Sequence, residues 1–254
     1  MEEHVSINRD HWNGMAADWV AAGEAAWASE LPYWGIWAEP ESALGMLPGD
    51  MRGMEAVELG CGTGYVSGWM ARRGARVTGI DISSEQLATA RRLAEEHGAD
   101  IRFLEGNAEV LPFEDARFDF AISEYGAAIW CDPAVWLREA WRVLKPGGQL
   151  VFLGHHAFIV MTTPLDGAAC ERVLHRPYRT LGRTDWTGVE IDPSGIEFSM
   201  TFSGWIGLFR EIGFSVEGLK EIYAPEGAVT QEFGVPPEWA RDFPSEHVWW
   251  LRKG

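Results

Sequence analysis

A glycine-rich turn flanked by acidic residues is the part of the sequence best suited to hold a ligand. Residues 57–65 read VELGCGTGY, with Glu58 before the turn and glycines at positions 60, 62 and 64. Glycines let a backbone turn sharply and approach a ligand that any Cβ would push away. Asp81 follows 21 residues after Gly60, where a carboxylate could accept hydrogen bonds from both hydroxyls of a ribose. The pattern predicts a site for a nucleoside-containing cofactor.

The spacing of the glycines argues against a dinucleotide. The dinucleotide fingerprint needs its third small residue three positions after the second glycine. Counted from Gly60 and Gly62, that position is Tyr65, which is too bulky for close packing of helix on strand. Counted from Gly62 and Gly64, it is Ser67, a weaker exclusion. The acid before the turn would also repel a pyrophosphate.

Strands and helices alternate around this turn. Strands are expected at 56–59, 76–80, 101–104, 118–123 and 149–153, and two more near 219–224 and 247–252. Ser83 is predicted to cap the helix after the second strand, with Gln86 as its capping-box partner. Asp132 is predicted to cap another helix, with Pro133 in its first turn. The alternation predicts an α/β, Rossmann-like, doubly wound and mostly parallel seven-stranded sheet with an antiparallel C-terminal strand.

Residues 1–254 are predicted to form one domain. Two regions of it do not show the alternation of strands and helices. The core is expected at about 51–155 and 201–254, and a helical, aromatic cap at 1–50 and 156–200. The first 50 residues hold five of the 14 tryptophans: Trp12, Trp19, Trp27, Trp34 and Trp37. We expect the cap to cover the carboxyl ends of the strands, where open α/β sheets bind ligands.

Five segments in register resemble the class I S-adenosylmethionine-dependent methyltransferases. They are VELGCGTGY at 57–65, VTGIDIS at 77–83, GNAEVLPF at 106–113, FDFAISEYG at 118–126 and REAWRVLKPGGQLVF at 138–152. The resemblance covers roughly residues 55–154. It implies S-adenosyl-L-methionine as the cofactor and in-line displacement at its sulfonium methyl group.

The resemblance also implies a role for each matching position. Asp81 would hold the ribose, Ile82 would pack on the adenine, and Asn107 and Ala108 would face the adenine edge. The family usually has Asp where this chain has Asn107, whose amide oxygen can still accept a hydrogen bond. The residues implied to shape the pocket for the methionine half are Glu58, Gly60, Gly62 and Gly64.

Three further positions are implied to lie near the reacting methyl group. Ser123 and Glu124, after the fourth strand, would line the floor of the pocket. Trp19 occupies the place of an aromatic residue that closes over the methionine end in many such enzymes. Trp12, Met15, Ala16 and Trp19 equally fit one face of a helix that packs on the domain.

A hydroxyl acceptor would need a base nearby, and an amine would have to present its neutral form. His155 and His156 directly follow the fifth predicted strand, at its ligand-facing end, and are the first catalytic candidates. Tyr125 and Glu124 come second, and His175 is a distant third. Both first candidates are also compatible with ordinary loop histidines.

Charge and cysteine content exclude several partners. Lys and Arg total 21 against 38 Asp and Glu, a net charge of −17, which disfavours binding to nucleic acid or to an anionic membrane. Three cysteines without a paired spacing favour a reducing compartment over a disulfide framework. No metal-ligand spacing is present, so no metal is expected. The N-terminus lacks the apolar core of a signal peptide, and we expect a cytoplasmic protein.

The sequence therefore predicts methyl transfer from S-adenosylmethionine to a small, aromatic or lipophilic metabolite. Trp130, Trp136 and Trp186, with the N-terminal tryptophans, would form an aromatic pocket, unless they only fill the core of the cap. The alternative function is binding of S-adenosylmethionine or S-adenosylhomocysteine without methyl transfer, as a regulator or in other chemistry.

Overall fold

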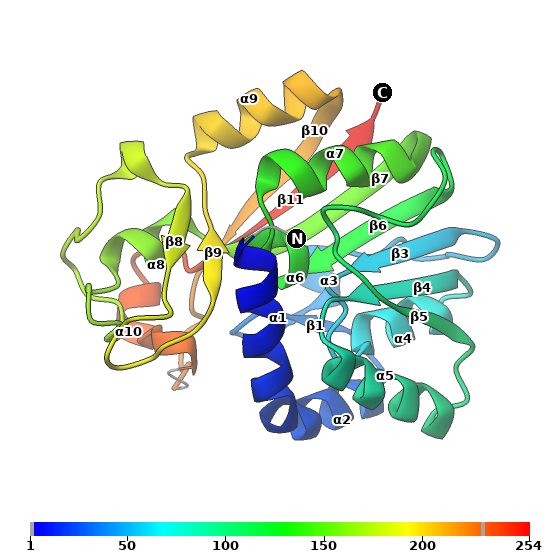
Figure 1. Cartoon of the computed structure of the whole chain (residues 1–254), viewed down its shortest axis with the longest axis horizontal. Coiled ribbons are helices and arrows are strands. Elements are labelled where there is room, and N and C mark those ends of the chain that lie inside the picture. The colour runs from blue at the N-terminus through cyan, green and yellow to red at the C-terminus, as the bar shows by residue number, and fades with distance from the viewer. Residues whose placement is uncertain (1–2, 230–231) are drawn as a thin grey trace.

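A seven-stranded sheet runs through the computed structural model, which describes residues 3–229 and 232–254 (Figure 1). Its order is β10-β11-β7-β6-β3-β4-β5. Neighbouring strands from β7 to β5 pair in parallel, and β11 is antiparallel to both β7 and β10. The strands are β3 (Glu55–Leu59), β4 (Arg76–Asp81), β5 (Ile101–Glu105), β6 (Phe118–Glu124), β7 (Leu144–His155), β10 (Phe214–Ile222) and β11 (Glu246–Lys253). This confirms the predicted Rossmann-like sheet with its antiparallel C-terminal strand.

Strand β7 is longer than the predicted 149–153. Leu144 already pairs with Phe118, whereas Phe120 pairs with Gln149, so the residues between them form an irregularity in the ladder. The Pro-Gly-Gly sequence at 146–148 therefore bends the start of a strand instead of only separating it from the preceding helix. At the other end β7 extends to His155, which pairs with Glu246 of β11.

Both faces of the sheet are covered, as expected for parallel strands that are buried on each side. Alternate residues of β7 enter different cores: Val151 and Leu153 belong to one, and Leu150 and Phe152 to the other. The first core includes α4 (Tyr65–Arg72) and buried residues between positions 26 and 51, and the second includes α7 (Pro133–Val143) and α9 (Phe202–Ile212). Trp136 is fully buried in the second core, so it does not contribute to an aromatic pocket as predicted.

The predicted helix caps form, one of them only in part. Asp132 accepts a hydrogen bond from the N–H of Ala134 at the start of α7, with Pro133 in the first turn. The Ser83 hydroxyl accepts a hydrogen bond from the N–H of Gln86 at 3.1 Å and so caps α5 (Ser84–Glu96). The reciprocal bond of a capping box is missing, because the N–H of Ser83 donates to Asp81 instead.

The two segments expected to form the cap contain short helices and strands. The N-terminal part holds α1 (Glu3–Met15), η1 (Ala16–Trp19), α2 (Val20–Ala28), β1 (Tyr33–Trp34), β2 (Glu39–Pro40) and α3 (Glu41–Leu44). The second holds α8 (Ala157–Thr162), η2 (Tyr178–Thr180), β8 (Arg183–Asp185) and β9 (Ile196–Phe198), and the remaining short helices are α6 (Gly126–Trp130), η3 (Glu232–Gly234) and α10 (Pro237–Ala240). Strand β9 pairs with β8 in a separate two-stranded sheet.

Asn8 joins the first helix to the 156–200 segment. Its side-chain amide donates to the carbonyl of Ile196 at 2.9 Å, and its oxygen accepts from the N–H of the same residue at 2.7 Å. A third bond runs from the amide to the carbonyl of Trp130 at 3.0 Å. In Figure 1, α1 lies beside β9 in front of the sheet. Asn8 is buried, so these bonds fix the position of α1 over the strand ends.

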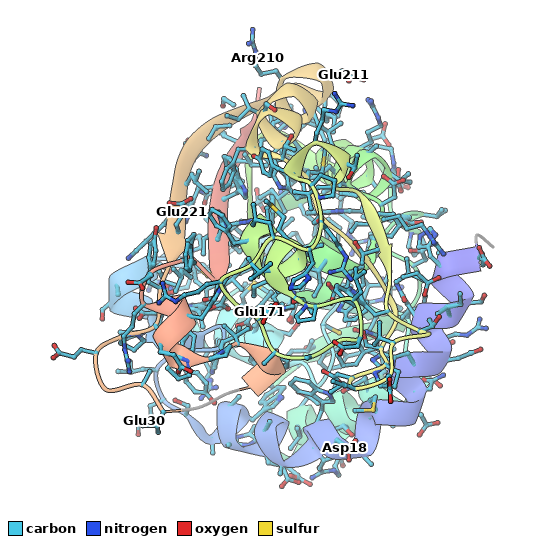
Figure 2. All side chains as sticks on the ribbon, turned by 90° about the vertical axis from the view of Figure 1, so that its left-hand side faces the viewer. Asp18, Glu30, Glu171, Arg210, Glu211 and Glu221 are labelled. Carbon is cyan, nitrogen blue, oxygen red and sulfur yellow. The ribbon has the colours of Figure 1, made fainter. Side chains whose placement is uncertain are left out.

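The surplus of carboxylates lies largely on the surface. Figure 2 shows exposed charged side chains from several elements, among them Asp18, Glu30, Glu171, Glu211 and Glu221. Within residues 3–229 and 232–254, no helix combines the length and apolar character needed to cross a bilayer.

Candidate active site

One continuous cavity of about 460 Å³ opens at the carboxyl ends of the parallel strands. Residues at the ends of β3, β4, β5, β6 and β7 all line it: Gly60, Asp81, Gly106, Glu124 and His155. The chain passes from one side of β3 to the other between β5 and β6, so the cavity lies where open α/β sheets bind ligands. Helix α1, η1 and residues 192–194 and 197 also contribute to the lining. The volume is that of a small-molecule site.

The glycine-rich turn forms the floor at the end of β3. Gly60 has φ +76°, and a Cβ on it would lie 2.5 Å from the Cα of Gly126. Gly62 has φ +50°, a conformation that side chains with a Cβ rarely adopt. Gly60 and Gly62 line the cavity, whereas Gly64 does not. Gly64 precedes α4 with φ +77°, and a Cβ on it would lie 2.7 Å from the Phe103 ring, so its role is to pack the turn.

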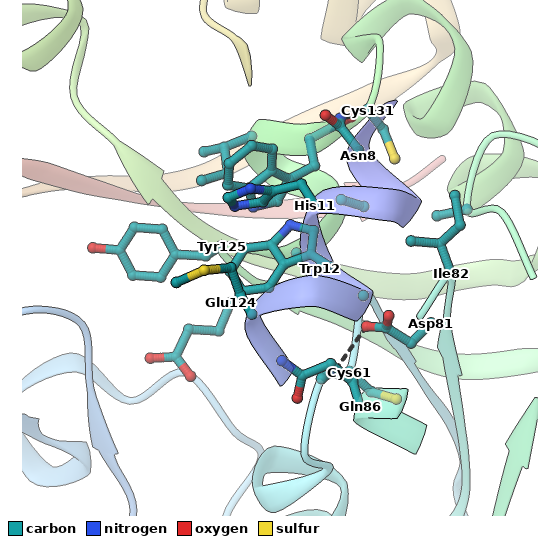
Figure 3. A pocket seen from close by; sticks show the side chains of 18 of the residues that line it. Asn8, His11, Trp12, Cys61, Asp81, Ile82, Gln86, Glu124, Tyr125 and Cys131 are labelled. Atoms are coloured by element: carbon teal, nitrogen blue, oxygen red, sulfur yellow. Dashed lines mark hydrogen bonds between the residues drawn. The ribbon is translucent and has the colours of Figure 1, made fainter. Parts of the chain in front are cut away.

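Asp81 faces this turn from the end of β4 (Figure 3). Its Oδ2 accepts the N–H of Gly62 at 2.7 Å, and its Oδ1 accepts the N–H of Ser83 at 2.8 Å. Burial raises the pKa of this carboxyl, and the backbone N–H groups partly offset the effect. Each oxygen has further acceptor capacity, so Asp81 can bind donor groups in the cavity.

Gln86 is a site residue that the sequence reasoning assigned to helix capping. It is buried at 3% exposure and lines the cavity, and its Oε1 has no hydrogen-bond partner among the described residues. Ser83 does not use this oxygen, because its N–H is bonded to Asp81. A buried amide oxygen without a partner is costly, so Gln86 has an acceptor available for a ligand.

The acids nearest the glycine turn are buried and bonded. Glu58 Oε2 accepts the N–H and the hydroxyl of Ser67 at 2.8 and 2.6 Å, and burial raises its pKa well above the usual value. Glu124 accepts the N–H of Gly35 at 2.9 Å and the hydroxyl of Tyr65 at 2.6 Å. Burial raises the pKa of Glu124 to about 7. Both carboxyls line the cavity, and Glu124 can exchange a proton near neutral pH.

Tyr125 places its ring in the cavity wall and its hydroxyl outside the cavity. It has φ 57° and ψ −71°, a strained γ-turn conformation for a residue with a side chain. The hydroxyl donates to Oε1 of Glu246, a buried residue of β11 that is not part of the lining. Because its hydroxyl proton is directed to Glu246, Tyr125 presents its ring and not its hydroxyl to the cavity.

The two adjacent histidines, proposed together as catalytic candidates, lie in different environments. His155 lines the cavity, and both of its ring nitrogens are buried without a hydrogen-bond partner among the described residues. His156 lies outside the lining: its Nδ1 accepts the N–H of Phe158 and so caps α8, and its Nε2 contacts Glu221 at 3.2 Å. Burial lowers the pKa of His156 to about 4. His156 is therefore structural, and only His155 has ring nitrogens free to meet a ligand.

Ser123 does not line the cavity, contrary to the expectation for the pocket floor. Its hydroxyl donates to the carbonyl of Leu59 at 2.8 Å and accepts the N–H of Ala128 at 3.2 Å, so it ties β3 to α6. His175 is also outside the lining and pairs with Glu171 at 2.6 Å. The other predicted contact residues do line the cavity: Trp19, Glu58, Ile82, Asn107, Ala108 and Glu124.

Several lining residues were not predicted from the sequence. They come from α1, the 156–200 segment and η3: Asn8, His11, Asp192, Glu197 and Phe233. For the first four of these, the only sequence signal was membership of regions expected to form a cap, whereas Phe233 lies in a stretch assigned to the core. Within the described part of the chain, no group of three or more His, Cys, Asp or Glu side chains is arranged to hold a metal ion.

The chain is similar to known methyltransferases over the same region. A family model described as a methyltransferase domain matches residues 57–152. A crystal structure of an S-adenosylmethionine-dependent methyltransferase from Mesorhizobium loti superposes with a TM-score of 0.64 at 26% identity, covering 84% of this chain and 96% of that one. Residues 57–152 therefore match a methyltransferase domain, and most of the chain has the fold of that S-adenosylmethionine-dependent methyltransferase.

Curated relatives match the chain over a limited segment. A malonyl-[acyl-carrier protein] O-methyltransferase of Pectobacterium atrosepticum is 40% identical over 114 residues, 44% of this chain and 42% of the relative. A demethylmenaquinone methyltransferase of Thermus thermophilus is 42% identical over 99 residues, 38% of this chain and 45% of the relative. The chain thus spans less than half the length of these curated relatives.

S-adenosylmethionine, the cofactor of such methyltransferases, fits the cavity of this chain. Ribose hydroxyls are donors, and Asp81 and the unpartnered Gln86 oxygen supply acceptors close to the glycine turn. The sulfonium is a cation, and among the described lining residues there are several carboxylates but no Lys or Arg. Donor chemistry and charge therefore agree with the cofactor.

Proposed function

We propose that this chain transfers the methyl group of S-adenosylmethionine to a small, aromatic or lipophilic metabolite. The observation that carries the proposal is the continuity of the cavity: the glycine turn and Asp81 open into the same space as Trp19, Tyr125 and His155. A cofactor bound at the glycine turn and a methyl acceptor bound at the aromatic end would therefore contact each other inside one cavity. The names of the curated relatives, a malonyl-[acyl-carrier protein] O-methyltransferase and a demethylmenaquinone methyltransferase, support an acceptor of this class.

We assign the nucleoside half of the cofactor to the ends of β4 and β5. Asp81 would accept from the ribose hydroxyls, with Gln86 as a second acceptor. Ile82 and Ala108 would contact the adenine faces, and Asn107 would face its edge. The Asn107 Oδ1 accepts the N–H of Glu109 at 2.9 Å, which holds the side chain in place.

The methionine half is assigned to the turn after β3 and to η1. Gly60 and Gly62 would let the backbone approach it, Glu58 and Glu124 would provide the acidic wall, and Trp19 would close over it. When bound, the cofactor supplies an electrophilic methyl group on its sulfonium. The protein contributes position and exclusion of water, which are the main sources of catalysis for such a displacement.

His155 is proposed to accept a proton from the substrate when the acceptor is a hydroxyl. A neutral imidazole has one nitrogen that can accept a proton, and both nitrogens of His155 are without a partner among the described residues. The rings of His155 and Tyr125 meet edge to face with centroids 5.0 Å apart, which holds the imidazole against the cavity wall. Tyr125 is a positioning residue in this scheme.

The test is a transfer assay with cofactor labelled in its methyl group and panels of phenols, amines, thiols and carboxylic acids. The proposal predicts labelled product from at least one panel, and its loss with Asp81→Ala. Binding of the cofactor with no transfer to any panel would instead favour the alternative, a cofactor-binding protein that does not methylate.

A further inference from the structure

Aromatic rings wall the part of the cavity beyond the glycine turn. Trp19 stacks on Phe233 with centroids 5.9 Å apart, and Phe233 stacks on Tyr125 at 6.2 Å. Trp12 and Trp130 meet edge to face at 5.3 Å, and both also line the cavity. We call this region the acceptor compartment; its aromatic walls are Trp12, Trp19, Tyr125, Trp130 and Phe233. Flat walls of this kind fit a planar ligand and attract cations to the ring faces.

Two carboxylates from the 156–200 segment enter the same compartment. Glu197 belongs to β9 and Asp192 to the preceding loop, and both line the cavity. Both lie close to His11: burial lowers the pKa of His11, while Asp192 and Glu197 act in the opposite direction. These two acids are separate from Glu58, Asp81 and Glu124, which lie at the strand ends and bond to the turn and its neighbours.

Glu197 lacks a cationic partner at bonding distance. Its side chain is 12% exposed, and its Oε2 accepts the indole N–H of Trp186 at 3.1 Å. Within the described residues, its one basic neighbour inside 4 Å is His155, whose Nδ1 is 3.8 Å away, too far for a hydrogen bond. A largely buried carboxylate in this setting favours a ligand that brings positive charge.

His155 gives a second, independent sign of a missing ligand. Both of its ring nitrogens are buried and unpartnered among the described residues, and the residue lines the cavity beside Glu197. One nitrogen of a neutral imidazole is a donor and the other an acceptor, so each leaves a hydrogen bond unmade. The cost of these unmade bonds is removed if a polar group of a ligand sits between His155 and Glu197.

We propose that the acceptor compartment binds an arylalkylamine in its protonated form, with the ammonium group anchored against Glu197 and the planar ring between the aromatic walls; this inference rests on the proposed function. The protonated nitrogen has no lone pair, so it anchors the ligand and another group of the substrate accepts the methyl group. Asp192, at the exposed rim, adds to the attraction for a cation. No Lys or Arg among the described lining residues offsets these carboxylates.

The same features select against two other head groups. A carboxylate would meet Glu197 and Asp192 as like charges and would lack a cation to pair with. An alcohol would form one neutral hydrogen bond, which is weaker than a charge-assisted bond to Glu197. The compartment should therefore rank compounds with the same ring in the order amine, alcohol, carboxylate.

The experiment uses the full chain saturated with S-adenosylhomocysteine, so that binding is measured without turnover. Calorimetric titrations with 2-phenylethylamine, 2-phenylethanol and 3-phenylpropionate at pH 7.5 compare three head groups on one ring. We expect the amine to bind at least about tenfold more tightly than the alcohol, and the carboxylate more weakly still. Equal affinities, a preference for the carboxylate, or no binding of the amine would overturn the inference.

The variant Glu197→Gln separates charge from shape. Glutamine keeps an oxygen for the indole of Trp186 but removes the negative charge. We expect the amine to lose about tenfold in affinity while the alcohol and S-adenosylhomocysteine bind as before. Glu190→Gln, an exposed change outside the cavity, is the matched control and should alter none of them. Unchanged amine binding in Glu197→Gln contradicts the inference, whereas absence of S-adenosylhomocysteine binding in the unmodified chain contradicts the proposed function.

Discussion

The Tyr125 hydroxyl donates a hydrogen bond to Glu246, 121 positions away in the sequence. Glu246 also accepts the N–H of Ile36 at 3.0 Å, and its other oxygen, Oε2, has no partner among the described residues. One buried carboxyl thus joins the end of β6, the start of β11 and the N-terminal segment. The bond also directs the hydroxyl of Tyr125 away from the cavity, so that only its ring lines the cavity wall.

The burial of Glu246 predicts a pH dependence of stability. Burial raises the pKa of Glu246 from 4.5 to about 7, so between these values the folded chain holds a proton that the unfolded chain releases. Stability should therefore fall as the pH rises from about 4.5 to 7. Glu246→Gln removes this effect and keeps an oxygen for Tyr125. Relative to the wild type, the variant should gain about 3 kcal/mol of unfolding free energy over this range.

Urea unfolding of both proteins at pH 4.5, 5.5, 6.5 and 7.5 measures this difference. Glu124, whose pKa is also raised to about 7, is present in both and cancels in the comparison. Parallel stability curves for the two proteins would show that Glu246 ionises in the folded state as readily as in the unfolded state.

Gln86→Met tests whether the unpartnered amide oxygen serves the ligand. Methionine has a similar length and leaves no unsatisfied acceptor in this buried position. The variant should be as stable as the wild type or more so, because the lone Oε1 is removed. Its affinity for S-adenosylhomocysteine should fall about tenfold through loss of one acceptor. Thermal denaturation and calorimetry measure the two effects, and a loss of stability with unchanged affinity would assign Gln86 to packing.

The adjacent histidines should respond differently to substitution. His155→Gln is expected to lower the rate of methyl transfer to a hydroxyl acceptor by about 100-fold or more, with S-adenosylhomocysteine affinity unchanged, because a general base contributes at least that much. The measurement is single-turnover transfer of the labelled methyl group. Full activity of His155→Gln toward a hydroxyl acceptor would remove the histidine from the mechanism.

His156→Ala is the matched comparison. It removes the Nδ1 acceptor at the start of α8 and the contact with Glu221, so a loss of about 1 kcal/mol or more in stability is expected. The transfer rate per folded molecule should change little. A large loss of rate without a loss of stability would place His156 in the site after all.

Sequence patterns predicted those parts of the site whose residues lie close together in the sequence. The glycine turn and Asp81 were found because strand, turn and helix follow one another within 25 residues of sequence, and the geometry at 60 and 62 requires glycine. The sheet followed from the alternation of strands with helices. Gln86 was misassigned because a capping box depends on which acceptor takes the N–H of Ser83, and the sequence does not show that Asp81 does.

The long-range parts had no local signal. Glu197 lies in a segment predicted only as part of the cap, and Phe233 lies in the stretch between the last two predicted strands. Tyr125 meets Glu246 only through the order of strands in the sheet. His155 and His156 are neighbours in sequence, yet only one of them faces the cavity. Trp136 was expected in an aromatic pocket, but it shares the apolar stripe of α7 with Leu137 and Ala140 and is buried against the sheet.

Calorimetric titration with S-adenosylhomocysteine tests the central claim most directly, namely that the nucleoside lies across the ends of β3 and β4 and is held by Asp81. We predict one site per chain, a loss of affinity of about 100-fold in Asp81→Ala, a smaller loss in Asp81→Asn, and no change in Glu95→Gln on the exposed face of α5. Absence of heat with both S-adenosylmethionine and S-adenosylhomocysteine, or wild-type affinity in a folded Asp81→Ala, would contradict it.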